Sequence, residues 1–262
     1  IQKLSSYGNI ILPVGEGFLA SGLNGKGRMI EPDLILKNII LYIKKSQPLY
    51  AKKILINAGP TYEPIDNVRF IGNYSSGKMG LELAIEALKL GALVKLIIGP
   101  NSLDLNRFSG DLVKVMTASE MFDQMIKNFD ESDIVIAAAA VADFSPKVKY
   151  SSKIKKEDGL KSIDLKKTKD ILFEMGKIKK NQLLIGFALE SDNEKSNALK
   201  KIKSKNLDAI ILNSLNDKNA GFNSDLNKIT FINKNGKSKP FVLKRKPLVA
   251  IDILNEIIKI NE

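Results

Sequence analysis

The chain has 262 residues, 44% of them hydrophobic, which is enough to bury the core of one large domain with a smaller appendage. It contains no Cys and no His, which excludes disulfides, Ser-His and Cys-His hydrolases, and metal sites built on those side chains. The formal charge is +12, but only four basic residues are Arg and Trp is absent, so we interpret the charge as a Lys-rich surface with an anion-binding site, not as a nucleic-acid interface.

Residues 1–47 are predicted to form an attachment and linker, and residues 48–262 the main domain. In the attachment we expect a strand at 10–14, loops at the Gly-rich stretches 15–17 and 22–27, and a helix at 32–44 with one apolar face. This is too little core to fold alone. The apolar run 34–43 is too short to cross a membrane, and nothing resembles a signal peptide, so we expect a cytoplasmic protein without membrane partners.

From residue 52 the sequence alternates strand and helix, as a series of βαβ units does. This predicts an α/β fold with a doubly wound, mostly parallel sheet, a polar Lys-rich flap at 147–167 and a C-terminal hairpin formed by 229–232 and 241–244. The expected strands are 53–57, 93–98, 113–116, 133–137, 183–188 and 209–213. The expected helices are 78–89, 119–128, 169–179, 194–205 and 247–260.

The stretch 53–80 is the centre of this pattern, because it contains the first strand, a long loop and a helix start. A helix that begins at Ser75-Ser76-Gly77-Lys78 directs free backbone N–H groups and its positive dipole end outward, so anions are expected there. Residues 72–79 also match part of a P-loop, but Met79 stands where that motif needs a hydroxyl for Mg²⁺. We therefore reject a P-loop. A Gly/Ser helix cap without a ligand is the structural alternative.

Two further strand ends carry side chains suited to a ligand site, because ligands of doubly wound sheets bind beyond the carboxyl ends of the strands. The run Ala137–Val141 leaves space for a ligand near the backbone, and Asp143 follows it; close helix–sheet packing is the alternative for the small residues. The second end is GFALE, residues 186–190. The KIKK run at 153–156 is either a solvated charge run or a flap that brings a Lys over bound phosphates.

Several long motifs occur together and in order: AGPTYEPIDNVRFIGNYSSGKMG, AAAVADFSP followed by KIKK, GFALE and AGFNSDLN. Over about residues 50–262 they closely resemble phosphopantothenoylcysteine synthetase. The earlier stretch PVGEGFLASGLNGKGRMIEP looks like the C-terminal tail of phosphopantothenoylcysteine decarboxylase, which bacteria commonly fuse to the synthetase as a bifunctional enzyme. Ser21 stands where the decarboxylase pattern has Cys. We expect no decarboxylase activity from this chain, and FMN only if an upstream decarboxylase domain is present.

The resemblance implies a Rossmann-like homodimer of the coenzyme A pathway that joins 4′-phosphopantothenate to cysteine with CTP and Mg²⁺ or Mn²⁺. The carboxylate of phosphopantothenate attacks the α-phosphate of CTP, and the amine of cysteine then displaces CMP from the acyl-cytidylate. Such a reaction needs alignment and charge neutralisation and no protein nucleophile, which fits a chain without Cys or His. The resemblance also implies that the C-terminal strands pair across the dimer axis, with residues 244–246 reaching the neighbour's triphosphate.

The resemblance also assigns site residues. Asn73 and Lys153 are the catalytic candidates, Asn73 on the reacting acyl group and Lys153 on the triphosphate. Asp143 is the candidate metal ligand. The substrate-binding candidates are Gly59, Asn73, Ser75, Ser76, Gly77 and Lys78. The nucleotide-binding candidates are Ala139, Ala142, Asp143, Phe144, Lys153, Asp170 and Phe187.

Some alternatives remain open at this point. The sequence does not decide between CTP and ATP, or which phosphate the turn at 75–78 holds. A Rossmann-type NAD(P)- or flavin-dependent oxidoreductase is the first alternative function, although the turn Gly59-Pro60-Thr61 lacks the G-x-G-x-x-G pattern. A basic nucleic-acid-binding module is the second, although the Lys residues are dispersed and aromatic residues are few.

Overall fold

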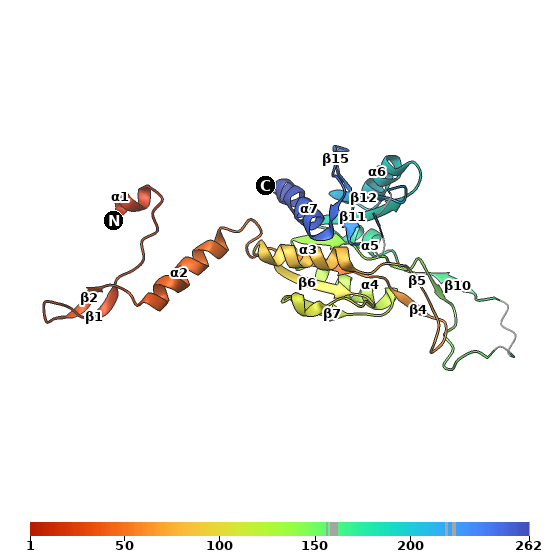
Figure 1. The fold of residues 1–262 in the computed structure, drawn as a ribbon, viewed down its shortest axis with the longest axis horizontal. Coiled ribbons are helices and arrows are strands. Elements are labelled where there is room, and N and C mark those ends of the chain that lie inside the picture. Colours follow the sequence, from red (N-terminus) through yellow and green to blue (C-terminus); the bar gives the residue numbers. More distant parts are fainter. Residues whose placement is uncertain (156, 158–161, 218–219, 222–223, 262) are drawn as a thin grey trace. The chain divides into compact units, whose positions relative to one another are not determined.

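The computed structural model describes all residues except 156, 158–161, 218–219, 222–223 and 262. It consists of two compact units, Ile1–Tyr50 and Ala51–Glu262 (Figure 1). None of the described helices is long and apolar enough to cross a membrane.

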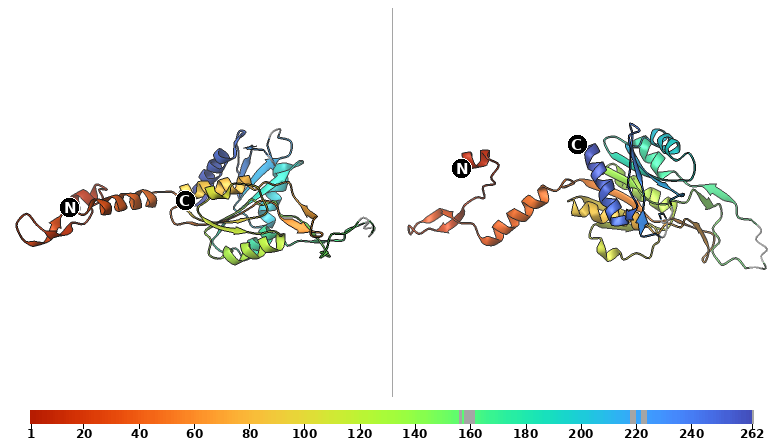
Figure 2. Two further views of the ribbon diagram at one scale, coloured as in Figure 1. Left: turned by 60° about the horizontal axis from the view of Figure 1, so that its bottom comes forward. Right: turned by 45° about the horizontal axis from the view of Figure 1, so that its top comes forward.

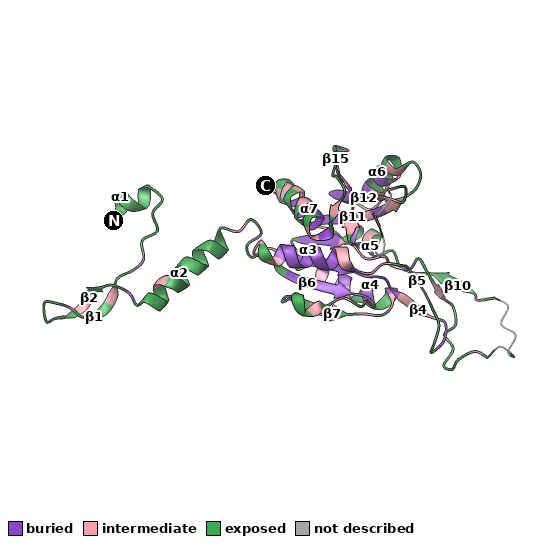
Figure 3. Cartoon of the chain, in the orientation of Figure 1, coloured by how far each residue is buried: buried purple, intermediate pink, exposed green. Residues whose placement is uncertain are grey.

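The first unit contains the predicted helix but a different pair of strands. Its elements are α1 (Gln2–Ser6), β1 (Gly15–Phe18), β2 (Asn24–Arg28) and α2 (Pro32–Lys45). The predicted strand at 10–14 and the two predicted loops are wrong. The Gly-rich stretches pair as an antiparallel hairpin, because a tight turn, in which the N–H of Leu19 donates to the carbonyl of Leu23 at 2.8 Å, closes the loop between them. No residue of α2 is buried (Figure 3).

The second unit is built on a mixed sheet that has eight strands within the described part of the chain. Its strands are β3 (Lys53–Ala58), β6 (Leu93–Ile98), β7 (Asp111–Lys114), β8 (Ile134–Ala137), β11 (Leu183–Glu190), β12 (Ala209–Ser214), β14 (Thr230–Asn233) and β15 (Ser238–Pro240). They lie in the order β15-β14-β12-β11-β8-β3-β6-β7, and all pairs from β12 to β7 are parallel.

Strand order reverses between β3 and β8. After β3 the chain adds β6 and β7 on one side, and it then crosses back to add β8, β11 and β12 on the other. This is the strand order of a Rossmann-type doubly wound sheet, in which the crevice at the reversal binds the ligand. The fold-class prediction is confirmed.

Helices cover both faces of the sheet, which is why the inner strands are almost continuously apolar. The helices are α3 (Lys78–Lys89), α4 (Ala118–Phe129), α5 (Ile171–Ile178), α6 (Glu194–Ser204) and α7 (Lys246–Asn261). Figure 2 shows helices on both faces of the sheet. α3 and α7 pack together, and apolar residues of α4, α5 and α6 form one cluster with residues of the sheet. α3 lies close against β3, because a Cβ on Gly80 would stand 2.5 Å from the Cβ of Ala58.

In the described part of the second unit, three short antiparallel pairs lie outside the main sheet. They are β4 (Tyr62–Pro64) with β5 (Phe70–Gly72), β9 (Phe144–Pro146) with β10 (Leu165–Lys167), and β13 (Leu226–Asn227) with β16 (Lys244–Arg245). The predicted C-terminal hairpin is present, but its second strand lies earlier than 241–244. β14 pairs with β15, and the N–H of Phe241 donates to the carbonyl of Ile229 at 2.9 Å at the end of this pair. The second strand lies earlier because Asn233 accepts hydrogen bonds from the N–H groups of Asn235 and Lys237 and so closes a tight turn.

Candidate functional site

A pocket of about 620 Å³ lies at the carboxyl ends of β3, β8, β11 and β12, where strand order reverses. Pockets of this size hold ligands as large as a nucleotide. Nine of the residues that the sequence predicted for the site line it: Ser75, Ser76, Gly77, Lys78, Ala139, Asp143, Phe144, Asp170 and Phe187.

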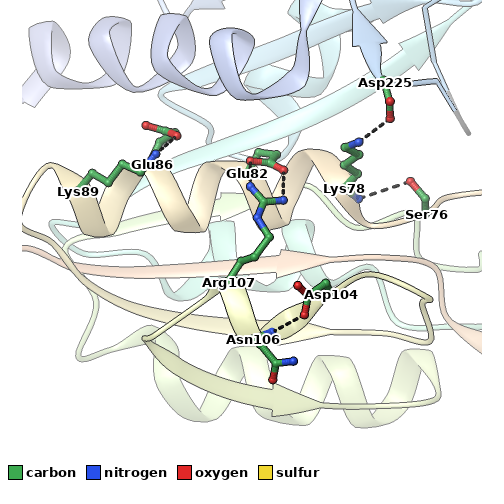
Figure 4. Close-up of polar contacts among 9 residues, drawn as sticks. All are labelled: Ser76, Lys78, Glu82, Glu86, Lys89, Asp104, Asn106, Arg107 and Asp225. Carbon is green, nitrogen blue, oxygen red and sulfur yellow. Dashed lines mark hydrogen bonds and ion pairs between the residues drawn. The ribbon is translucent and has the colours of Figure 1, made fainter.

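The start of α3 gives the pocket an anion-binding wall. Gly77 precedes the helix with φ +79° and offers no side-chain cap, whereas Thr117 and Asp170 cap α4 and α5. Among the described residues, the hydroxyl of Ser75 accepts a hydrogen bond only from the N–H of Gly77 at 3.3 Å. The hydroxyl of Ser76 accepts one only from the N–H of Lys78 at 3.5 Å (Figure 4). The next N–H groups of the helix therefore remain available to a ligand. β5, which precedes this turn, is three residues long and outside the main sheet, which agrees with the rejection of a P-loop.

The loop of small residues after β8, residues 138–142, is called the alanine loop here, and hydrogen bonds from its backbone N–H groups hold it in place. The N–H groups of Ala139 and Ala142 donate to the side chains of Asn57 and Thr61, each at 3.0 Å. The N–H of Ala140 donates to the carbonyl of Gly59 at 2.9 Å. These bonds fix the shape of the loop, so its small side chains leave the pocket open to a ligand beside the backbone.

Gly59 and Ala142 do not line the pocket; the carbonyl of Gly59 binds this loop, and Ala142 belongs to the loop. Gly59 has φ +81°, and a Cβ there would lie 3.2 Å from the backbone nitrogen of Gly99, so the turn needs glycine. Ala142 is buried, and its carbonyl accepts a hydrogen bond from the hydroxyl of Thr168 at 2.6 Å.

Asn73 is exposed on the loop after β5 and is not among the residues that line the pocket. Its side-chain nitrogen donates to the carbonyls of Ala140 (3.0 Å) and Val141 (3.1 Å). Because both partners are acceptors, the amide must present its nitrogen to them, and its oxygen is left as the free hydrogen-bonding atom.

Lys153 is exposed and lies on the flap between β9 and β10, outside the residues that line the pocket. The flap is bound to the β4–β5 hairpin. Asp66, whose side chain is fully buried, accepts from the N–H of Ile154 at 3.2 Å and from the guanidinium of Arg69 at 3.0 Å. The hydrogen bond from Arg69 lowers the pKa of Asp66 far below its ordinary value. Lys156, the last residue of the KIKK run, lies outside the described residues.

Side chains of both charges line the wall formed by β9, α5 and β11. Asp143 and Phe144 are exposed at the pocket, and Phe187 lines it from β11. Asp170 accepts the N–H of Phe173 as the cap of α5 at 3.0 Å, and it forms an ion pair with Lys205 at 2.7 Å. Asp170 therefore stabilises the start of α5, in addition to its predicted role in nucleotide binding.

Lys78 points across the start of α3 to Asp225 and forms an ion pair with it (Figure 4). The Asp225 side chain is 78% exposed, and its hydrogen bond from Lys78 lowers the pKa of Asp225. An anion in the pocket would compete with Asp225 for the ammonium of Lys78.

The sequence reasoning did not select several residues that belong to the site. Asn57, Lys205 and Asn213 line the pocket, and Thr61 binds the loop after β8. Lys246 at the start of α7 lines the pocket of its own chain, whereas the resemblance implied that residues 244–246 reach the neighbour's triphosphate. Asn57 and Asn213 share one sequence signal. Each is the last residue but one of an otherwise apolar strand, β3 and β12 respectively.

The described residues contain no group of three or more His, Cys, Asp or Glu side chains that could hold a metal by itself. Asp143 is a carboxylate at the pocket. Such a site fits Mg²⁺, which commonly uses one or two carboxylates and takes its other ligands from phosphates and water.

Comparison with known proteins identifies the family. Residues 49–260 match the model of the DNA/pantothenate metabolism flavoprotein C-terminal domain. The chain belongs to this family. The recognition made from the motifs is thereby confirmed, and the family match begins two residues before the second compact unit.

Individual relatives of this flavoprotein-domain family agree in sequence and fold. A cysteine/cysteine sulfinic acid decarboxylase from an unknown prokaryotic organism is 49% identical to this chain. The match covers 97% of this chain and 72% of the decarboxylase. The coenzyme A biosynthesis bifunctional protein CoaBC of Bacillus subtilis is 42% identical over 100% of this chain, which spans 65% of that protein. The crystal structure of the C-terminal domain of a CoaBC protein is 39% identical, with a TM-score of 0.70 over 82% of this chain and 98% of that domain.

Proposed function

We propose that this chain is the CTP-dependent ligase that joins 4′-phosphopantothenate to cysteine in coenzyme A biosynthesis. The observation that carries the proposal is the pocket at the strand-order reversal, with the uncapped start of α3 on one wall and Asp143 beside the alanine loop on another. Family membership supports the pathway, and the pocket supports a ligand that carries phosphates.

In the first step a carboxylate oxygen of phosphopantothenate attacks the α-phosphorus of CTP, and pyrophosphate leaves. Ser75, Ser76 and Lys78 hold phosphate oxygens with hydroxyl, N–H and ammonium donors, and Lys153 reaches the triphosphate when the flap closes. Phe144 and Phe187 frame the base. Mg²⁺, bound by Asp143 and phosphate oxygens, would neutralise negative charge on the phosphates.

In the second step the amine of cysteine attacks the acyl carbon, and CMP leaves with the electron pair of the broken C–O bond. Asn73 belongs to this step, because its free side-chain oxygen is an acceptor that suits the N–H of the incoming amine. The surplus proton of the amine passes to water or to the departing phosphate, and no protein nucleophile takes part.

The direct test incubates the chain with phosphopantothenate, cysteine, Mg²⁺ and CTP, and follows pyrophosphate, CMP and the amide product. We expect all three products in equal amounts, and parallel reactions with ATP measure the preference for the base. A folded sample that releases no pyrophosphate at saturating substrates contradicts the proposal. Carbon dioxide release from cysteine sulfinic acid in its place would instead support the activity named for the decarboxylase relative.

A thermal-shift panel separates this proposal from its alternatives. CTP with Mg²⁺ is expected to raise the melting temperature, whereas NADPH, FMN and a DNA oligomer are not. A shift with NADPH or FMN alone would favour an oxidoreductase, and a shift with DNA alone would favour a nucleic-acid-binding module.

We also infer a homodimer from the family resemblance. Light scattering at micromolar concentration is expected to give twice the mass of one chain. A single-chain mass under these conditions would contradict this inference without affecting the proposed reaction.

A further inference from the structure

Lys246 differs from the other Lys residues near the C-terminus in being buried. It is the first residue of α7 and only 4% exposed, whereas Arg245 beside it is exposed. Its backbone N–H donates to the carbonyl of Asp225 at 3.0 Å, and its side chain lines the same pocket as the start of α3. Because α7 packs along α3, the first residues of both helices meet at this pocket.

The ammonium of Lys246 is poorly compensated within the described part of the chain. Among the described residues, the ammonium donates one hydrogen bond, to the carbonyl of Gly221 at 3.4 Å. Lys78 places a like charge near it, and the carboxylate of Asp225 is already paired with Lys78. Burial first, and then the charge of Lys78, lower the pKa of Lys246, while Asp225 opposes them.

A buried ammonium with so little compensation is costly for the fold, since burying a charge without a good partner disfavours the native state. An apolar side chain would fill the position better if its role were packing. A charged side chain at position 246 becomes favourable only when an anion enters the pocket and pairs with the ammonium.

A second observation indicates that the pocket is built for a polar ligand. Asn213 lines it from the end of β12, and its Oδ1 is buried without a hydrogen-bond partner among the described residues. Buried polar atoms are nearly always paired. An unpaired acceptor at a pocket therefore points to a ligand that brings an N–H or O–H group, as the base or sugar of a nucleotide does.

We propose that Lys246 and Lys78 together clamp the oligophosphate part of the ligand, Lys78 from the start of α3 and Lys246 from the start of α7. The inference rests on the proposed function. When the phosphates bind, Lys78 exchanges Asp225 for a phosphate oxygen, and Lys246 gains the anionic partner that it lacks. Binding at alkaline pH is then accompanied by proton uptake, because the anion stabilises the charged form of Lys246.

The test compares Lys246→Met with a control variant, Lys239→Met. Lys239 forms an ion pair with Glu256 of α7 and does not line the pocket. Isothermal titration of the full chain with CTP and with inorganic pyrophosphate, both with Mg²⁺, measures affinity. Loss of a charge-assisted contact is expected to weaken binding roughly 10- to 100-fold in Lys246→Met and less than about twofold in Lys239→Met. Titrations of the unchanged chain at pH 9 in two buffers of different ionisation enthalpy are expected to show proton uptake that Lys246→Met lacks.

Melting temperatures without ligand separate this role from a structural one. Lys246→Met is expected to melt at the same temperature as the unchanged chain or higher, because it removes a buried charge. Equal affinity of the variant and the unchanged chain overturns the clamp, and so does weaker binding that merely accompanies a lower melting temperature. If the unchanged chain binds neither CTP nor pyrophosphate, the proposed function fails as well; if it binds both and Lys246→Met binds them equally, only the clamp fails.

Discussion

The side-chain amide of Asn73 donates to the carbonyl oxygen of Ala140 at 3.0 Å, across 67 residues of sequence. It donates to Val141 in the same way, so one side chain joins the loop after β5 to the alanine loop. The amide nitrogen holds the loop through these two bonds, and the amide oxygen has no hydrogen-bond partner among the described residues; the proposed reaction assigns it to the incoming amine. This division predicts different outcomes for two substitutions of one residue.

Asn73→Ala is expected to impair the second chemical step. Pyrophosphate release continues, the acyl-cytidylate accumulates, and amide formation slows by about 10²–10³-fold, as loss of a transition-state hydrogen bond does in other enzymes. Asn73→Asp is expected to slow both steps, because its carboxylate would face two carbonyl oxygens and displace the loop. Quench-flow measurement of pyrophosphate and amide distinguishes the cases. Equal loss of both signals in Asn73→Ala would contradict this division.

Lys153→Gln is expected to slow the first step, and with it both signals, because the developing charge on the triphosphate loses a cation. The same quench-flow assay measures it. Lys147→Gln is the matched control, since Lys147 is exposed on the same flap and pairs weakly with Asp164 at 4.0 Å. If both substitutions have the same small effect, the flap does not act through Lys153.

Asp66→Asn is expected to release the flap from the β4–β5 hairpin. Amide hydrogens at Tyr150 and Ile154, which donate to Ile65 and Asp66, should then exchange faster. Because the folded pKa of Asp66 is lowered, its stabilisation is present above the ordinary carboxyl pKa of about 4 and is lost as the pH falls below that value. Urea unfolding should therefore separate the unchanged chain from Asp66→Asn at pH 7 and less so at pH 3. A pH-independent difference would contradict the assignment.

Arg107→Met is expected to lower the free energy of unfolding by about 2–4 kcal/mol, because it leaves a buried carboxylate without its partner. Arg107 donates two hydrogen bonds to Glu82, at 3.0 and 3.2 Å, and Glu82 is only 1% exposed (Figure 4). Lys180→Met is the control, since Lys180 and Asp130 form an exposed pair whose loss should cost less than about 1 kcal/mol. Denaturant titration measures both, and equal effects would contradict the argument.

The sequence was sufficient to predict the doubly wound sheet. Strands that are buried on both faces appear in the sequence as short apolar runs, and amphipathic helical segments alternate with them. It failed at the short pairs β4–β5 and β9–β10, whose three residues carry too little alternation to be recognised. It also failed at the N-terminal hairpin. The Gly residues there predicted loops, but the backbone forms an antiparallel pair of strands.

The candidate site was predictable where its residues sit in motifs, such as Ser75–Lys78. It was not predictable at Thr61 or Asn57, because their task is to bind backbone N–H groups that lie about 80 residues away. The burial of Lys246 has no local sequence signal either. This residue stands in a Lys-rich stretch, and only the packing of α7 on α3 buries it.

Two of the four Arg residues bind the buried carboxylates Asp66 and Glu82, whereas the cationic side chains proposed to bind the ligand are all Lys. Acetylating reagents modify Lys and leave Arg unchanged. In most Lys–carboxylate pairs of the described residues the Lys side chain is exposed, and pairs whose two partners are both exposed, such as Lys180 with Asp130, contribute little to stability. Lys179 and Asp208 form a pair that is buried and shielded from a reagent. Mild acetylation of the whole protein is therefore a reaction that the fold should survive and ligand binding should not, and CTP present during the reaction should protect the lysines that it covers.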